Sequence, residues 1–302
     1  MATRASGPWS TGKLETTGGG WTVKRNPIVA GTAKRLIELV WGRPKRVVFV
    51  ATTGRSGTAT LAARLRPVEG WAAFHEPHPT MSGIPSACAS RGDMRAAAAC
   101  YRYAKSVYIR WYARSARIYV ETNHLFATVF ADYVFEDFGD AVSVIVLSRE
   151  RADVARSIFE LGHFPGTPFG DAWYLDPFAA ENVVHYPELL QFLPFEHPLF
   201  RCLWYCVEVG ERVDLLRERF PRWDWIDLST SDLNRAERLR ALVARIDPGS
   251  LPAQLDADFG SALNQKSTFK ERANLRLSDA EFRRLVEAFD DAEARWRATR
   301  AS

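Results

Sequence analysis

The stretch Arg46-Val-Val-Phe-Val-Ala-Thr-Thr-Gly-Arg-Ser-Gly-Thr58 predicts the fold of this 302-residue chain. Its first part, residues 46–53, is a continuous β-branched and aromatic run of the kind found in strands that are buried on both faces. A glycine-rich turn follows at once, and residues 59–65 are good helix formers. The order strand, glycine turn, helix is the opening unit of an α/β fold.

The same alternation continues along the chain. Strands that alternate with helices predict a parallel β-sheet flanked by helices on both faces. We expect residues 1–42 to form an N-terminal tail with one short helix, and residues 43–302 to form a single α/β domain. The further strands are expected at 71–75, 117–122, 141–147 and 223–228, and the helices at 32–41, 93–114, 125–135, 152–161, 199–219, from Ser231 or Asp232 onward, and 278–297.

Residues 162–198 interrupt this pattern. The helical period is lost there among six prolines, and eight aromatic residues crowd the same stretch. A long insertion of this composition inside an α/β domain is typical of a lid or a binding loop rather than of core.

Composition excludes several classes of protein. With 47 % apolar and 25 % charged residues, the chain is globular rather than disordered. No run of eighteen apolar residues predicts a membrane span, and the first twenty residues lack the apolar core of a secretory signal, so we expect a cytoplasmic protein. The four cysteines lack metal-type spacing, and we expect neither a metal site nor disulfides.

Arginine dominates the basic residues: 33 of the 40 are Arg and seven are Lys, with a net charge of only +4. Arg binds phosphate and sulfate through a planar fork of donors, so this composition suits an anionic ligand, although biased codon usage accounts for most of the excess. The 36 acidic residues are interspersed, so there is no polybasic block and we expect no nucleic-acid partner. Position must therefore decide which arginines matter.

The turn after the first strand is suited to bind an oxyanion. Backbone N–H groups of the turn and of the following helix converge on one point, where the helix dipole adds positive potential. Gly54 and Gly57 allow close approach of the backbone, and Arg55 adds a permanent charge. A nucleotide-hydrolysing P-loop has a Gly-Lys pair followed by Ser or Thr, and the absence of that pair here argues against a small-molecule kinase.

The turn resembles the 5′-phosphosulfate loop of the sulfotransferases that use 3′-phosphoadenosine 5′-phosphosulfate (PAPS), in the form Thr-x-Gly-Arg-Ser-Gly-Thr. A second motif follows in the expected order. Arg149 ends a predicted strand, and Ser157 lies eight residues later in the next helix, as in the 3′-phosphate site of that family. Taken alone, the same two residues could be a capping Arg and a solvated helical Ser. The resemblance covers residues 46–161 and implies a P-loop nucleotide-hydrolase-like sulfotransferase fold.

The resemblance further implies transfer of a sulfuryl group from PAPS to an acceptor hydroxyl or amine, with release of 3′-phosphoadenosine 5′-phosphate (PAP) and without a metal. Lys266 falls in a polar loop, residues 263–274, where the family has a basic C-terminal loop, although the family's Arg-Lys-Gly form is absent. Thr58 and Thr60 have the alternative role of ordinary first-turn helix residues. The implied cofactor contacts are Thr53, Gly54, Arg55, Ser56, Gly57, Thr58, Thr60, Arg149, Ser157 and Lys266.

An acceptor hydroxyl also needs a general base, and the segment Phe74-His75-Glu76-Pro77-His78 offers three candidates. In family members with a similar Glu-Pro segment the Glu is the base, so Glu76 is the first candidate. A histidine is the base in other branches, which leaves His75 and His78 open. The alternative is that Glu-Pro simply turns the chain.

The remaining members of the predicted site are less specific. Arg55 is expected to stabilise charge on the leaving phosphate, which adds it to the catalytic set. Asn123 and His124 end the strand at 117–122, where each either orients the acceptor or the base, or caps the next helix. We expect the acceptor to be a small or carbohydrate-like molecule, with the 162–198 insertion helping to form its pocket. A non-catalytic nucleotide-binding module is the alternative, and such a module has no need of Glu76 as a base.

Overall fold

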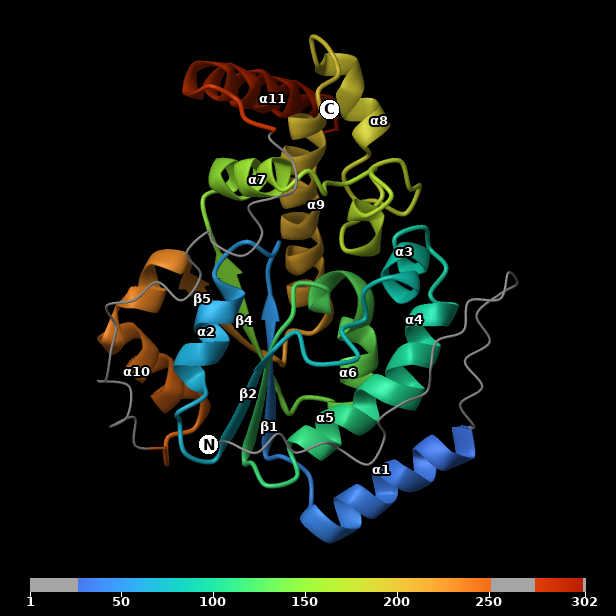
Figure 1. Cartoon of the computed structure of the whole chain (residues 1–302), viewed down its shortest axis with the longest axis vertical. Coiled ribbons are helices and arrows are strands. Elements are labelled where there is room, and N and C mark those ends of the chain that lie inside the picture. Colours follow the sequence, from blue (N-terminus) through green and yellow to red (C-terminus); the bar gives the residue numbers. More distant parts are fainter. Residues whose placement is uncertain (1–26, 251–274, 301–302) are drawn as a thin grey trace.

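The computed structural model describes residues 27–250 and 275–300, which form a parallel sheet covered by helices (Figure 1). Neighbouring strands are all parallel, in the order β2-β3-β1-β4-β5. The α/β fold with a parallel sheet flanked by helices is therefore confirmed. The strands are β1 (Arg46–Ala51), β2 (Trp71–His75), β3 (Ile118–Thr122), β4 (Val142–Ser148) and β5 (Asp224–Ser229).

Strand β1 lies at the centre of the sheet and is buried on both faces, as its continuous apolar run predicts. Val47 and Phe49 point into a large hydrophobic cluster on one face, and Val48 and Val50 into a smaller one on the other. Both faces of β1 therefore need a cover of helices, and the turn that follows Ala51 emerges at the end of the sheet where parallel α/β folds bind ligands.

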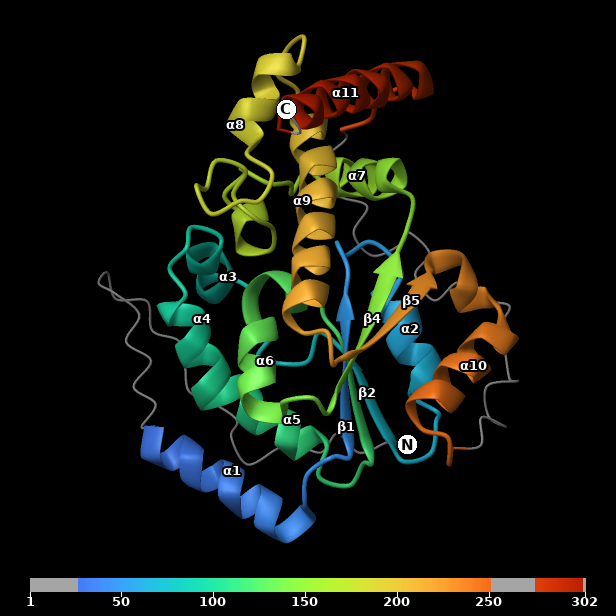
Figure 2. The ribbon, with the colours of Figure 1, turned by 180° about the vertical axis from the view of Figure 1, so that it is seen from behind.

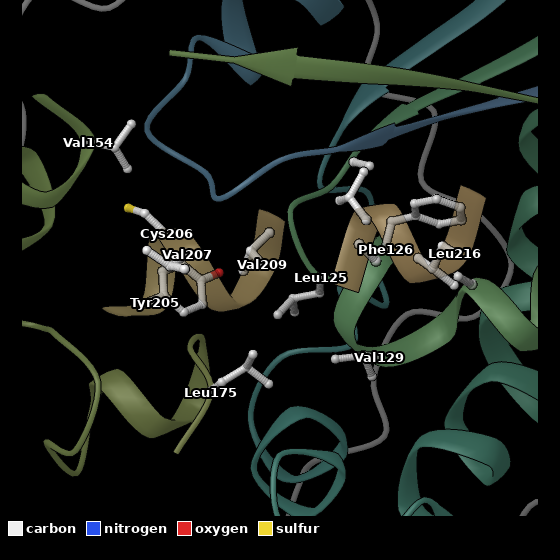
Figure 3. Close-up of a cluster of buried hydrophobic side chains, with 14 of the residues drawn as sticks. Leu125, Phe126, Val129, Val154, Leu175, Tyr205, Cys206, Val207, Val209 and Leu216 are labelled. Atoms are coloured by element: carbon white, nitrogen blue, oxygen red, sulfur yellow. The ribbon is translucent and has the colours of Figure 1, made fainter. Parts of the chain in front are cut away.

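The smaller cluster is covered by two helices, α2 and α10, and the larger one by most of the others. Helix α9 runs roughly along the direction of β1 and extends beyond the carboxyl ends of the strands (Figure 2). Figure 3 shows side chains of α7, α9 and η2 in the larger cluster. The elements are α1 (Pro27–Trp41), α2 (Thr58–Leu65), α3 (Ile84–Ala89), α4 (Arg95–Cys100), the π-helix η1 (Tyr101–Lys105), α5 (Ser106–Tyr112), the π-helix η2 (Phe126–Phe130), α6 (Ala131–Phe138), α7 (Arg151–Glu160), η3 (Gly170–Ala172), α8 (Tyr186–Leu189), η4 (Leu190–Phe192), α9 (Pro198–Arg219), η5 (Thr230–Asn234), α10 (Ala236–Ile246) and α11 (Asp279–Arg300).

Most predicted elements are present, with differences that have local causes. The helix expected from Ser231 or Asp232 begins only at Ala236. The Ser and Asp capping groups belong instead to the 3-10 helix η5, where Ser229 and Asp232 form a capping box. The helix expected at 93–114 is divided by the π-helical turn η1, and the short helix α3 was not predicted.

The prediction that residues 162–198 lie outside the core is wrong in part. Phe164, Tyr186 and Leu189 of this segment are buried in the larger hydrophobic cluster. The segment has little regular structure because its prolines interrupt helices, yet its aromatic side chains are large enough to fill space around α9.

Two features bear on the class of protein. None of the four cysteines, all of which lie within the described residues, is in a disulfide bond. Cys202 and Cys206 are buried on one helix, α9, where they pack as small apolar side chains. Within residues 27–250 and 275–300, no helix has the length and apolar character that crossing a membrane requires.

Candidate functional site

The glycine-rich turn after β1 has the backbone conformation of an anion cradle. Gly54, Arg55 and Gly57 all have left-handed φ angles, of +75°, +56° and +88°. Helix α2 begins directly after Gly57, and no described residue accepts a hydrogen bond from the backbone N–H groups of residues 55–60. Several free donors and the positive end of a helix dipole therefore meet at one point.

Hydroxyl groups fix the shape of this turn. The buried Ser56 donates from Oγ to the carbonyl oxygen of Gly54 at 3.0 Å, and Thr53 donates to the same oxygen at 3.0 Å. Thr230 Oγ1 lies 2.8 Å from Ser56 O and 3.0 Å from Ser148 O, so it ties the turn to the end of β4. Thr58 is buried and Thr60 half-buried in the first turn of α2. The turn is thus preorganised by its own side chains.

The two arginine motifs lie together although they are about 100 residues apart. Arg55 donates from Nε to Ser157 Oγ at 3.0 Å, and Arg149 donates from Nη1 to the carbonyl oxygen of Arg55 at 3.1 Å. Strands β1 and β4 are neighbours whose connections leave toward opposite edges of the sheet, so this is a topological switch point. Both guanidinium groups therefore stand in the crevice at the carboxyl end of the sheet.

Glu76 reaches the same region through His124. The ring of His124 donates from Nδ1 to Glu76 Oε1 at 2.8 Å, and Nε2 lies 3.2 Å from the carbonyl oxygen of Trp173. A Cβ added to Gly54 would lie 3.3 Å from His124 Cγ, so the imidazole packs directly on the turn. The end of β2, the end of β3 and the phosphate-type turn thus form one site.

The environment of Glu76 keeps its carboxyl ionised. Burial alone would raise the pKa of Glu76, but the hydrogen bond and charge of His124, with smaller contributions from His75 and Lys105, hold that pKa below its usual 4.5. Glu76 also has a left-handed φ of +44°. A half-buried carboxylate held in this way is an acceptor of protons at neutral pH.

A buried ion pair supports the segment that carries Glu76. Lys105 Nζ lies 2.5 Å from Glu121 Oε1, with both side chains almost fully buried, and also donates to Pro77 O at 3.2 Å. Tyr119 and Asn123 donate to the two oxygens of the same carboxylate at 2.7 and 2.9 Å. This network holds the turn after β2 in place, and Lys105 and Glu121 were not predicted as site residues.

The other candidates have different surroundings. His75 is exposed, and its Nδ1 lies 3.1 Å from both O and Oγ1 of Thr122. The exposed His78 packs its ring on Tyr108.

Asn123 donates from its side-chain amide to Thr80 O and accepts through Oδ1 from the backbone N–H of Leu125, so it caps the turn after β3 and anchors the Glu76 segment. Lys266 lies outside the described residues.

Two tyrosines complete the surroundings of the imidazole. Tyr174 lies with its ring centroid 6.2 Å from that of His124 and 5.0 Å from that of Tyr205, and Trp173 stacks on the same imidazole at 5.9 Å. The hydroxyl of Tyr205 is buried and has no hydrogen-bond partner among the described residues. Burial raises the pKa of both tyrosines, so both hydroxyls stay protonated.

A cavity of about 380 Å³ adjoins the turn on the side of α9. Its lining includes Thr53, Arg149 and, at the middle of α9, Gly210, where an added Cβ would meet no atom within 4 Å. The site is therefore next to open space. Within the described ranges, no cluster of three or more His, Cys, Asp or Glu side chains is arranged to hold a metal ion.

Comparisons with known proteins found little. No protein-family model matches the chain, and no curated protein matches it. One solved structure that is similar is a retinol dehydratase in complex with androsterone and the inactive cofactor PAP. The sequences are 16 % identical, the match covers 85 % of this chain and 68 % of that one, and the TM-score is 0.30. At this similarity the comparison assigns no function to this chain.

Proposed function

We propose that the chain is a sulfotransferase that moves a sulfuryl group from PAPS to an acceptor hydroxyl or amine. One observation carries the proposal: the turn after β1 and the Arg149–Ser157 motif after β4 form a single crevice, joined by the contacts of Arg55 with Ser157 and of Arg149 with Arg55. Such a crevice suits a nucleotide with anionic groups at two positions.

The residues fit the two ends of PAPS. The free N–H groups of residues 55–60 offer donors to a 5′-phosphosulfate. Arg149 and Ser157 offer a guanidinium and a hydroxyl to a 3′-phosphate. When bound, PAPS supplies the activated sulfuryl group. Arg55 lies between the two positions, where its charge favours the leaving phosphate.

Glu76 is the proposed general base. The His124 ring lies between Glu76 Oε1, 2.8 Å from Nδ1, and Trp173 O, 3.2 Å from Nε2, and these two contacts fix the orientation of the Glu76 carboxylate. The carboxylate is thereby placed to take the proton of the acceptor. His124 is therefore a positioning residue in this proposal.

The two alternatives lack support from these contacts. A kinase P-loop places a Lys after its last glycine, whereas Gly57 is followed here by Thr58. A module that only binds nucleotide has no use for a carboxylate held by an imidazole beside the anion cradle. The Glu76–His124 pair therefore favours catalysis.

Calorimetry with purified protein tests the cofactor. PAP is expected to bind without magnesium and much more tightly than ATP with magnesium, because the crevice has donors for a 3′-phosphate. Preference for magnesium-ATP would overturn the proposal. Transfer of labelled sulfate from PAPS, screened against phenols, sugars, sterols and amines, then identifies the acceptor class, and a protein that binds PAP but transfers to none of them would support the binding module instead.

A further inference from the structure

Thr230 joins the two halves of the crevice, although it is not one of the residues proposed to bind the nucleotide. Its Oγ1 lies 2.8 Å from Ser56 O, in the turn after β1, and 3.0 Å from Ser148 O, at the end of β4. A threonine hydroxyl has a single proton, so one group serves both carbonyl oxygens. Ser148 directly precedes Arg149, so this link connects the halves that are proposed to hold the 5′ and the 3′ groups.

The other side-chain links between these halves use the groups that the nucleotide itself would engage. Among the described residues, these links are the hydrogen bonds from Arg55 Nε to Ser157 Oγ and from Arg149 Nη1 to Arg55 O. Both guanidinium groups and the hydroxyl of Ser157 are proposed to bind the nucleotide, so a bound phosphate competes for them. The link through Thr230 does not depend on where the ligand draws these side chains.

Thr230 is itself held by a rigid support on the β5 side of the sheet. It is the first residue of η5, in which Ser229 and Asp232 form a capping box. Leu233 of the same helix packs directly on the turn, because a Cβ added to Gly57 would lie only 2.7 Å from Leu233 Cδ1. The hydroxyl of Thr230 therefore has a fixed place from which to hold the turn and the end of β4 together.

We propose that Thr230 is a positioning residue that sets the separation of the two anion positions, and so makes the crevice select a nucleotide phosphorylated at both its 5′ and 3′ positions. This inference rests on the proposed function. A ligand with two anionic groups gains the full affinity of the second group only when the two positions match the separation of its own phosphates. A ligand with one phosphate uses one position and does not depend on that separation.

Calorimetry with three nucleotides tests this role. The ligands are PAP, AMP, which has only the 5′-phosphate, and adenosine 3′-phosphate. Thr230→Val keeps the shape of the side chain without its hydroxyl, and should bind AMP up to about fivefold more weakly because the turn loses one hydrogen bond. The same variant should bind PAP about 25-fold more weakly, so the ratio of PAP affinity to AMP affinity falls about fivefold. Adenosine 3′-phosphate should bind as it does to the parent.

Two further variants separate the hydroxyl from its surroundings. Thr230→Ser keeps the hydroxyl and should restore the parent's ratio of PAP affinity to AMP affinity. Ser231→Ala is the matched control, because Ser231 follows Thr230 in η5 and its Oγ lies 2.7 Å from Ser229 Oγ. This control should bind all three nucleotides as the parent does. Each ratio is measured within one preparation, so a partly unfolded variant does not change it.

Three results would overturn the inference while the parent still prefers PAP. One is an unchanged ratio of PAP affinity to AMP affinity in Thr230→Val. Another is an equal fall of that ratio in Thr230→Ser, which would show that the hydroxyl is not the cause. The third is a loss of affinity for adenosine 3′-phosphate as large as the fall in the ratio, which would mean that Thr230 shapes one position only. A parent that does not prefer PAP would overturn the proposed function, and this inference with it.

Discussion

Replacing Arg149 with Ala should reduce the preference of the protein for a nucleotide that carries a 3′-phosphate. In the structure the side chain is 36 % exposed, and its one carboxylate partner among the described residues is the exposed Asp153 at 3.4 Å. Breaking this ion pair to bind a ligand costs little free energy, because exposed pairs of this kind contribute at most about 0.5 kcal/mol to stability.

The magnitude follows from two contacts. A charge-assisted bond to a 3′-phosphate contributes about 1.5–3 kcal/mol, and the exposure of Arg149 places it at the lower end, about 1.5 kcal/mol or roughly tenfold in Kd. The bond from Arg149 to Arg55 O contributes about 1 kcal/mol to the shape of the turn, roughly fivefold for any 5′-phosphate ligand. Arg149→Ala should therefore bind AMP about fivefold more weakly and PAP about fiftyfold more weakly.

The assay is calorimetry with PAP and AMP on the parent, on Arg149→Ala and on Arg156→Ala. Arg156 is the matched control because it lies close by in the chain, on α7, but pairs with Glu160 and Asp279. The ratio of PAP affinity to AMP affinity is expected to fall about tenfold in Arg149→Ala and to stay at the parent value in Arg156→Ala. Equal losses for PAP and AMP would refute the reasoning, because Arg149 would then act only by holding the turn.

Three further predictions concern other parts of the site. Glu76→Gln should lower kcat by about 10²–10⁴ with unchanged affinity for PAP, and the parent's kcat should decline only as pH falls below about 4.5, because the pKa of Glu76 is lowered; a decline centred near pH 6.5 would instead identify a histidine base. Gly54→Ala should weaken PAP binding about tenfold or more, because the added Cβ would press on His124, whereas Gly42→Ala, at nearly the same positive φ but with no atom within 4 Å of the added Cβ, should bind PAP as the parent does; unaltered PAP binding in Gly54→Ala would show that the contact with His124 does not shape the turn. Lys105→Met should destabilise the fold by about 3–5 kcal/mol, seen as a fall of roughly 5–8 °C in thermal unfolding, and making the partner carboxylate an amide as well should restore part of that loss; no restoration would mean that the buried charge is not the cause.

The sequence predicts the centre of the fold well because the determining pattern is local. A continuous apolar run such as residues 47–51 has to be buried on both faces, and that requirement alone predicts a central strand and helices on both sides. The turn at 54–58 follows from the same short stretch. Pairing of the turn with Arg149 and Ser157 was expected only from the family resemblance, since nothing local brings residues about 100 positions apart into contact.

The buried ion pair of Lys105 with Glu121, which supports the site, is harder to predict from the sequence, although both residues stand at positions where a charge is unexpected. Lys105 stands on the apolar stripe that passes through Tyr101 and Tyr108, and Glu121 stands inside a strand that is buried throughout. A charge in either place requires a partner, because burying it alone is too costly. That rule predicts that Lys105 and Glu121 each have a partner of opposite charge, but neither position indicates which residue that partner is. The π-helical turn that ends at Lys105 is likewise not visible in the sequence pattern.

Pairing, more than number, decides which arginines bind something outside the protein. Arg151 and Arg212 illustrate the common case, in which acidic residues within the chain neutralise the guanidinium. Arg55 has no carboxylate partner among the described residues, and the one hydrogen bond that its guanidinium makes with them goes to the hydroxyl of Ser157. Its uncompensated charge stands beside the free N–H groups of α2, where potentials of the same sign add and only an anion relieves them. The excess of arginine in the composition therefore becomes informative where the balancing acid is missing, as at Arg55, or forms only an exposed pair, as Asp153 does with Arg149.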